Sequence, residues 1–301
     1  PAFEKILREG LNRYPNVTLL VGVEAQEIKQ IENYVTVKIK DKSTNEFVEY
    51  TAPWLVGCDG GRSIVRSSLK IEMHALEPAR DWIIVDTLLK HPDDAKLLPD
   101  KFQYNFDKER LTIFAHGIGN NNRWEFQLNK NEIMPDNKTI ISWVGKYIDI
   151  DKLQITRIAK YAHNSLVAQQ WKINRVILAG DAAHMMPPSA GQGLCSGVRD
   201  AVNLAWKLDR VINNQASEKL LSTYEQERKQ HLYQILKRTL FFGKTLNADN
   251  FFERLLRSVK IRLIQNIQPL KMYLRNKYNT PPKLENGILS SQSSLAGQHL
   301  P

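Results

Sequence analysis

Cysteine is scarce in this chain of 301 residues, which contains only Cys58 and Cys195. The two do not form the spaced framework that disulfide-rich secreted domains carry, so we expect a reducing compartment and a cytoplasmic protein. Long apolar runs are missing as well, since none approaches the roughly 18 residues that a membrane span requires. No secretory signal peptide is visible in the residues given, so the sequence offers no evidence for export or membrane insertion.

Acidic residues are outnumbered: 32 Asp and Glu accompany 42 Lys and Arg, a formal net charge of +10. A basic excess can serve nucleic acid or an anionic membrane surface. No aromatic-basic motif of a nucleic-acid-binding fold accompanies it, so we expect no nucleic-acid partner and ascribe most of the charge to solvated helix surfaces. Part of the positive field can serve an anionic cofactor and a carboxylate substrate.

The most informative stretch is Arg175–Leu208, RVILAGDAAHMMPPSAGQGLCSGVRDAVNLAWKL, in which a strand pattern leads into a helix pattern. The apolar run 176–179, closed by Gly180, predicts a strand buried on both faces of a parallel sheet. Asp181 follows at the carboxyl end of that strand, where open α/β sheets bind ligands, and its carboxylate can accept hydrogen bonds from a ribose hydroxyl. This order predicts a site for a nucleotide-type cofactor.

A proline pair and a glycine pair shape the loop between that strand and the helix. Pro187 and Pro188 hold the chain extended and delay the helix, whereas Gly191 and Gly193 let the backbone approach a ligand closely. Apolar residues at helical spacing from Leu194 onward place the N-terminus of the helix at the glycine pair. Its free N–H groups and its dipole favour an anionic ligand by roughly 0.3–2 kcal/mol.

Two motifs resemble a known family. GDAAH-x-x-PP-x-x-GQG followed by D-x-x-NLAWKL resembles the second FAD-binding motif of the class A FAD-dependent aromatic monooxygenases, the para-hydroxybenzoate hydroxylase-like family. WLVGCDGGRSIVR, Trp54–Arg66, resembles the Asp-Gly motif of the same family, which serves both FAD and the nicotinamide cofactor. The stretches FEKILREGLNRYPNV and RWEFQL resemble those members that hydroxylate 3-(3-hydroxyphenyl)propanoate.

The resemblance implies an α/β fold of mixed α+β character. Its parts are an incomplete Rossmann-like FAD-binding domain, an inserted and mostly antiparallel β-sheet domain for the substrate, and C-terminal helices. It also implies that NADH or NADPH reduces FAD and that the reduced flavin and O2 form a flavin hydroperoxide. This species would hydroxylate a phenolic carboxylic acid of the 3-(3-hydroxyphenyl)propanoate type.

The resemblance also assigns the cofactor-binding residues, while no residue is identified as the group that deprotonates the phenol. The residues expected to bind the cofactor are Asp59, Gly60, Arg66, Ala179, Gly180, Asp181, Ala182, His184, Pro187, Pro188, Gly191, Gln192, Gly193 and Leu194. Gln192 and the backbone from Gly191 to Leu194 are expected at the anionic reduced flavin. The substrate is expected between the proline pair and the inserted sheet, near Trp124 and Phe126.

The chain departs from the family at both ends and inside both motifs, where Gly61-Arg62 replaces a small residue and Asn after the Asp-Gly pair. The family's G-x-G-x-x-G turn, which cradles the FAD pyrophosphate, occurs nowhere, and the chain opens at Pro1 in a helical pattern. We therefore expect a fragment that lacks the first βαβ unit, binds FAD weakly alone and is inactive alone. Residues 281–301 resemble a linker to the family's thioredoxin-like domain, which we expect to be missing. Ser189 replaces a larger residue and could alter the substrate pocket.

We expect five segments along the chain. They are part of the FAD-binding domain (1–71), the substrate-binding β-sheet domain (72–172), the return segment of the FAD-binding domain (173–236), a helical segment (237–280) and a linker (281–301). The helical segment is basic and amphipathic, which leaves a membrane-surface helix open beside ordinary helices that cover the core or an oligomer face. A homo-oligomer is therefore left open.

The coarse secondary structure places these segments on strands and helices. The expected elements are a helix at 2–13, strands at 17–21, 25–31, 34–39, 46–50 and 52–56, sheet strands at 83–88, 101–106, 111–116, 123–128 and 161–167, and a helix at 135–144. A buried strand at 176–179 and a helix beginning at the glycine pair complete the pattern.

Several candidate residues have a structural alternative. Asp59 can simply cap a strand-to-turn junction, and Arg66 can pair with a phosphate or with a nearby carboxylate. His184 can shape the loop at the flavin or be a satisfied structural histidine. Asp200 and Asn203 are expected to orient the motif rather than touch substrate.

Other functions are left open by the residues alone. Another flavoprotein monooxygenase on the same scaffold, such as an epoxidase or a hydroxylase of a quinone precursor, has the same motifs. An inactive truncated remnant would keep the fold without flavin turnover. His116 and His163 show no metal-ligand spacing, so we expect structural roles for them and no metal site.

Overall fold

The structure is a computed structural model that describes residues 2–107, 109–188, 191–246, 251–280, 282–285 and 287–288. Its contacts divide the chain into two compact units. Unit 1 comprises Pro1–Glu72 and Ala168–Ala183, and unit 2 comprises Met73–Val167 and His184–Pro301. Ser189 and most of the expected linker 281–301 lie outside the described residues.

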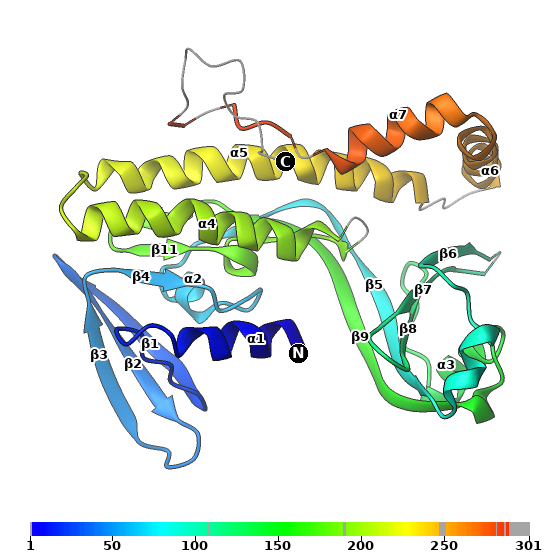
Figure 1. Ribbon diagram of the computed structural model, residues 1–301, viewed down its shortest axis with the longest axis horizontal. Helices are drawn as coiled ribbons and strands as arrows, with labels where there is room; N and C mark the ends of the chain where they lie inside the picture. Colours follow the sequence, from blue (N-terminus) through cyan, green and yellow to red (C-terminus); the bar gives the residue numbers. More distant parts are fainter. Residues whose placement is uncertain are drawn as a thin grey trace. The chain divides into compact units, whose positions relative to one another are not determined.

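Unit 1 contains two small sheets and two short helices (Figure 1). The first sheet is antiparallel, in the order β1-β2-β3, and is formed by β1 (Val23–Ile31), β2 (Tyr34–Asp41) and β3 (Phe47–Ala52). The second has the order β10-β11-β4 and is formed by β4 (Leu55–Gly57), β10 (Lys172–Ile173) and β11 (Val176–Leu178). The remaining elements are α1 (Ala2–Leu11), α2 (Ile64–Ser68) and the 3-10 helix Gly180–Ala182.

The second sheet brings the two cofactor motifs together. β11 is an apolar strand whose three residues are all buried, and it pairs with β4 in parallel, with Ile177 opposite Val56. The carboxyl ends of parallel strands lie at the same edge of a sheet, so Asp59 and Asp181 both follow strands that end at this edge. A Cβ added to Gly57 would come within 2.9 Å of Val65, so glycine is needed where α2 packs on β4.

Two strand predictions in unit 1 fail: residues 17–21 form no strand, and residues 52–56 do not form one continuous strand. Residues 17–21 are apolar but form no strand and pair with no strand among the described residues, because a β-propensity run needs a neighbour to complete its hydrogen bonds. The expected strand 52–56 is divided between the end of β3 and β4. Pro53 interrupts it, because proline has no N–H to donate to the ladder.

Unit 2 contains the inserted antiparallel sheet that the sequence predicts. The six strands lie in the order β12-β9-β5-β8-β7-β6 and are β5 (Met73–Leu89), β6 (Gln103–Phe106), β7 (Leu111–His116), β8 (Asn121–Gln127), β9 (Leu153–Ala168) and β12 (His184–Met185). Strand pairs β5–β8, β8–β7, β7–β6 and β12–β9 are antiparallel. Short 3-10 helices at Pro92–Leu97 and Ile150–Lys152 precede β6 and β9.

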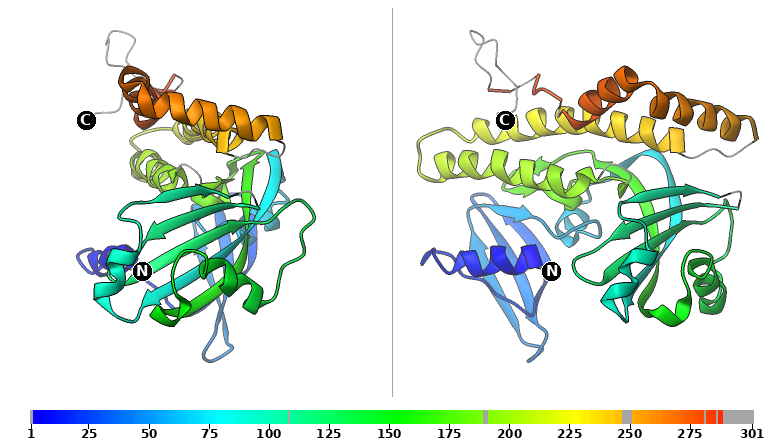
Figure 2. Two further views of the ribbon diagram at one scale, coloured as in Figure 1. Left: turned by 90° about the vertical axis from the view of Figure 1, so that its right-hand side faces the viewer. Right: turned by 45° about the vertical axis from the view of Figure 1, so that its right-hand side comes forward.

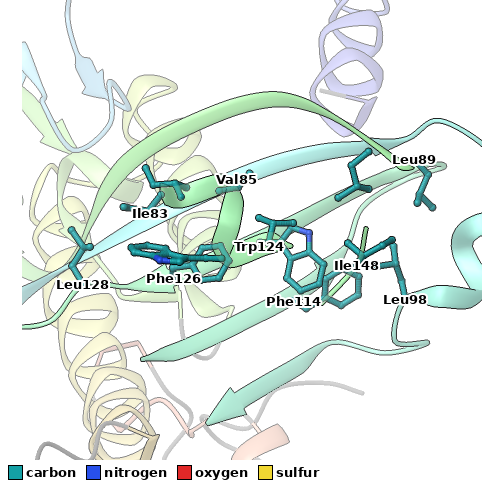
Figure 3. Packing of buried hydrophobic residues seen from close by; sticks show 13 residues of the cluster. Ile83, Val85, Leu89, Leu98, Phe114, Trp124, Phe126, Leu128 and Ile148 are labelled. Carbon is teal, nitrogen blue, oxygen red and sulfur yellow. The ribbon is translucent and has the colours of Figure 1, made fainter. Parts of the chain in front are cut away.

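One face of this sheet forms the main hydrophobic core of unit 2 against α3 (Asn137–Val144). Figure 3 shows the packing of Ile83 and Val85 from β5 with Trp124 and Phe126 from β8. The Asp136 carboxylate caps α3 by accepting a hydrogen bond from the Thr139 N–H at 2.7 Å, so the helix starts two residues later than expected.

The helices of unit 2 follow the sheet. They are α4 (Gln192–Ile212), α5 (Lys219–Leu246), α6 (Phe251–Asn266) and α7 (Gln268–Asn279). Figures 1 and 2 show α4 and α5 side by side along much of their length, and α6 packs against α7. Within the described ranges, no helix combines the length and apolar character needed to cross a membrane.

Candidate functional site

Asp181 is placed in unit 1 with an exposed side chain. It lies in the 3-10 turn that follows β11, while Ala179 and Ala182 on either side are buried. Its carboxylate makes no hydrogen bond or ion pair with any residue that the structure describes. The carboxylate at the end of this strand is therefore accessible to a ligand.

Asp59 has a different environment. Its Oδ1 accepts a hydrogen bond from Ser63 Oγ at 2.5 Å, and its Oδ2 accepts one from the Val65 N–H at 3.0 Å. Ser63 Oγ in turn accepts from the Arg66 N–H at 2.9 Å and caps α2. Asp59 thus has the capping role that the sequence left open, and Gly60 follows it in the left-handed region with φ 79°.

Arg66 connects the two motifs of unit 1 through backbone carbonyls. Its Nη1 donates to Ala182 O at 3.0 Å and its Nη2 donates to Gly61 O at 2.8 Å. The expected carboxylate partner does not occur among the described residues. Burial lowers the pKa of Arg66, while the charge of Asp59 raises it. Arg66 therefore holds the Asp-Gly loop against the turn that carries Asp181.

In unit 2, the second motif supplies the start of a long helix, as predicted. Gly191 is the N-cap of α4, in the left-handed region with φ 61° and ψ 23°, and as a glycine it has no side chain to cap the helix. A Cβ built at Gly191 or Gly193 would meet no heavy atom within 4 Å, so open space lies beside this backbone. The side-chain carbonyl of Gln192 accepts a long hydrogen bond from Arg199 Nη1 at 3.5 Å. The N-terminus of α4 has the dipole and the space that an anionic group needs.

His184 is buried in a charge network rather than exposed to a ligand. Its Nε2 is 2.6 Å from Asp200 Oδ2, and Asp200 Oδ1 accepts from Arg228 Nε at 2.9 Å. Arg228 Nη1 lies 2.8 Å from His231 Nδ1. Burial would raise the pKa of Asp200, but His184 and Arg228 lower it overall. His184 therefore has the structural role that the sequence left open.

A second buried network lies one to two turns further along α4. Lys207 Nζ donates to Glu227 Oε2 at 2.6 Å, and Asn203 Nδ2 donates to the same oxygen at 2.7 Å. Together with the Asp200 network, these contacts join α4 to α5 by polar groups. Asp200 and Asn203 therefore face protein partners and hold the helix that the glycine pair begins.

A pocket opens in unit 2 beside the sheet face opposite α3. Its lining includes Arg80 and Trp82 from β5, Tyr104 from β6, His163 from β9 and Pro187 from the proline pair. Residues of α5 complete it. Neither Pro188 nor the glycine pair lines it.

The prediction that Trp124 and Phe126 lie beside the substrate is wrong. Trp124 and Phe126 are each 1% exposed and belong to the core on the α3 side of the sheet. Successive residues of a strand face opposite sides, and the register places Phe126 opposite Ile83, a neighbour of Trp82. The pocket is therefore built from the alternate set of side chains. Sequence reasoning missed Trp82 and His163, although period-2 alternation would have separated the two sets.

The pocket combines charged and uncharged polar groups: Glu77 and Arg80 belong to its lining, together with Tyr104 and His163. Burial lowers the pKa of His163 to about 4 and raises the pKa of Tyr104 to about 12. The His163 imidazole is stacked on the Trp82 indole, with ring centroids 4.6 Å apart. Both aromatic groups and the imidazole are therefore neutral near pH 7, which suits an aromatic ligand.

The burial of neutral His163 predicts an acid-sensitive stability. Its pKa falls from 6.5 to about 4 on folding, so the unfolded chain binds more protons between these values. This contribution is complete above the unfolded pKa and is lost as the pH falls toward the folded one. We expect the titration of His163 to lower the free energy of unfolding by on the order of 2 kcal/mol when the pH falls from about 7.5 to about 4.5.

Urea titrations of the wild-type protein and His163→Phe at both pH values measure this loss. The variant lacks the titrating group, so its stability should fall less steeply on acidification. If the free energy of unfolding fell by the same amount in both proteins between the two pH values, the assignment would be contradicted.

Comparison with known proteins identifies the family. The family model described as FAD binding domain matches residues 1–239. The 3-(3-hydroxy-phenyl)propionate/3-hydroxycinnamic acid hydroxylase of Burkholderia cenocepacia (strain HI2424) is 33% identical over 298 residues, which cover 97% of this chain and 54% of that protein. The chain spans about half the length of the curated relatives it matches.

Two solved structures share the fold. The flavin-dependent monooxygenase PieE, in complex with FAD and substrate, has a TM-score of 0.77 at 20% identity, covering 97% of this chain and 56% of that one. CabE, an aromatic hydroxylase from angucycline biosynthesis, has a TM-score of 0.79 at 22% identity, covering 99% and 60%. With the FAD-binding model matched from residue 1 to 239, the chain belongs to the family of class A FAD-dependent aromatic monooxygenases.

Proposed function

We propose that the protein uses FAD, NADH or NADPH, and O2 to hydroxylate a phenolic carboxylic acid of the 3-(3-hydroxyphenyl)propanoate type. The observation that carries this proposal is that Pro187, a member of the second FAD motif, lines the same pocket as Trp82 and Tyr104. A residue of the cofactor motif therefore borders a pocket with aromatic walls. The relatives at 33% identity carry the name of a hydroxylase of this substrate class.

The residues of both cofactor motifs fit FAD. Asp181 offers an exposed carboxylate, which can accept hydrogen bonds from ribose hydroxyls. Gly60, Gly191 and Gly193 each leave space where a Cβ would otherwise stand, so a ligand can approach the backbone. The uncapped N-terminus of α4 favours negative charge on a flavin ring. Within unit 1, Asp59 and Arg66 hold the Asp-Gly loop in place by their protein contacts.

Bound FAD, once reduced by the nicotinamide cofactor, supplies the activation of O2 that ring hydroxylation requires. The residues of the chain bind and enclose the substrate. Arg80 provides a guanidinium for the carboxylate, and Trp82 and Tyr104 provide aromatic walls. Pro187 adds an apolar surface to the lining of the pocket.

Product analysis tests this proposal on the protein expressed from its complete gene. Incubation with 3-(3-hydroxyphenyl)propanoate, FAD and NADH or NADPH under isotopically labelled O2 should yield a dihydroxy acid that contains one labelled oxygen atom. Reduced nicotinamide consumed with hydrogen peroxide as the sole product would contradict the proposal. An epoxide or a hydroxylated quinone precursor, formed from other substrates in parallel incubations, would instead assign a different reaction to the scaffold.

A further inference from the structure

Two side chains that line the pocket of unit 2 each have a buried ring nitrogen with no hydrogen-bond partner in the described chain. The nitrogens are Nε1 of Trp82, a residue that is 3% exposed, and Nε2 of His163, a residue that is 8% exposed. Buried polar groups are normally satisfied, because leaving one without a partner costs its full desolvation free energy. The two rings stack with an interplanar angle of 13° and both line the pocket. A ligand in the pocket is the natural source of the missing partner.

An unpartnered indole nitrogen alone does not indicate a site. Trp124 Nε1 also lacks a partner in the described chain, but Trp124 packs in the α3 core and does not line the pocket. Trp82 differs because its ring stacks on that of His163, which also has an unpartnered nitrogen, and because both residues line the pocket. The difference between these two tryptophans also supplies a matched control.

The donor and acceptor character of the pair selects one kind of chemical group. An indole N–H can only donate, whereas a neutral imidazole can accept at Nε2 when its proton is on Nδ1. Because burial lowers the pKa of His163 to about 4, the imidazole is neutral at physiological pH. A hydroxyl group both accepts and donates, so it has the chemical character to pair with either nitrogen. A carboxylate cannot donate to His163, and an ammonium cannot accept from Trp82.

We infer that Trp82 and His163 bind the ring hydroxyl of the substrate, with Trp82 donating to the hydroxyl oxygen and His163 accepting the hydroxyl proton in a hydrogen bond. This inference rests on the proposed function and adds the orientation of the substrate. Arg80 precedes Trp82 by two residues on β5 and therefore shares its face of the sheet, where it can receive the carboxylate end. The hydroxyl stays protonated in the bound ground state, because an imidazole of such low pKa does not remove a phenolic proton.

Equilibrium binding of two acids tests the assignment without flavin turnover. The acids are 3-(3-hydroxyphenyl)propanoate and 3-phenylpropanoate, which differ only in the ring hydroxyl, and calorimetry gives a Kd for each with the protein expressed from its complete gene. We expect the wild-type protein to bind the hydroxylated acid about 10-fold or more tightly. In Trp82→Phe and His163→Phe this preference should fall to roughly threefold or less.

Two further variants make the result specific. Trp124→Phe removes the same N–H from the opposite face, so it should keep the wild-type preference. His163→Gln retains a carbonyl acceptor and should restore part of the preference that His163→Phe loses. Thermal melts followed by circular dichroism verify that each variant is folded before its Kd ratio is compared.

The outcomes separate the two proposals. Wild-type protein that binds neither acid contradicts the proposed substrate class, and the orientation falls with it. Wild-type protein that binds both acids equally leaves the substrate class standing and overturns the role of the pair. A preference that survives in both Trp82→Phe and His163→Phe overturns it as well.

Discussion

Replacement of Asp200 by asparagine should lower the free energy of unfolding by about 3–5 kcal/mol at neutral pH. Asp200 is 0% exposed and is the carboxylate between His184 and the buried guanidinium of Arg228. Asparagine keeps the size of the side chain but removes its charge, so the Arg228 cation stays buried without a counter-charge. Breaking one partner of a buried pair is costly for this reason, even where replacing both partners is not.

The pKa of Asp200 determines the pH at which the effect of its replacement should be measured. Its folded pKa lies below the ordinary value of 3.8, so its stabilising contribution is present above that value and is lost as the pH falls below it. Urea titrations near neutral pH therefore report the full effect.

An exposed ion pair of similar length provides the control for Asp200→Asn. Lys146 Nζ lies 2.6 Å from Glu109 Oε2, but the two side chains are 51% and 65% exposed. We expect Glu109→Gln to change the free energy of unfolding far less than Asp200→Asn does, because surface pairs are solvated in both states. Asp200→Asn with Arg228→Met should recover part of the loss, since the unpaired charge is then gone. Equal effects of Asp200→Asn and Glu109→Gln would show that burial does not set the contribution of the pair.

The cofactor motifs were predictable from sequence because the information is local. The strand, the turn at Asp181 and the helix that starts at Gln192 follow one another within about one supersecondary unit, and each has its own signal. Buried β-branched residues indicate the strand, and the glycine pair indicates the helix start. The structure confirms both, including the left-handed Gly191 that a side chain would strain.

The pocket was not predictable because its residues come from distant parts of the chain. Trp82, Tyr104, His163 and Pro187 meet only when the sheet of unit 2 and its helices are assembled. The alternation in RWEFQL does show that Trp124 and Phe126 share one face. It cannot say whether α3 or a ligand covers that face, because both environments favour aromatic side chains.

The hydrogen-bond partners of Arg66 were also not predictable from the sequence. Arg66 was expected at a phosphate or a carboxylate, yet it donates to two carbonyls, Gly61 O and Ala182 O. Backbone oxygens are present at every residue, so no sequence pattern distinguishes this arrangement. It depends on the parallel pairing of β4 with β11, which brings the two loops to one edge.

Asp181→Ala should weaken FAD binding by about 10- to 100-fold, because a carboxylate that accepts a hydrogen bond from a ribose hydroxyl contributes about 1.5–3 kcal/mol. The side chain is exposed and has no partner among the described residues, so its removal should change the unfolding free energy by less than about 0.5 kcal/mol. Loss of flavin without loss of stability is the signature of a ligand contact. Titration of the apoprotein with FAD, followed by flavin fluorescence, measures the Kd.

Asp59→Ala is the matched control, since both aspartates follow strands that end at the same edge of one sheet. Asp59 accepts hydrogen bonds from Ser63 Oγ and the Val65 N–H, so its loss removes the support of α2 and should cost about 0.5–2 kcal/mol of stability. The two variants should therefore separate: Asp181→Ala affects chiefly the Kd for FAD, and Asp59→Ala affects chiefly the unfolding free energy. Unchanged FAD affinity in Asp181→Ala would refute the ribose contact. A loss of stability in that variant as large as in Asp59→Ala would assign Asp181 to the fold instead.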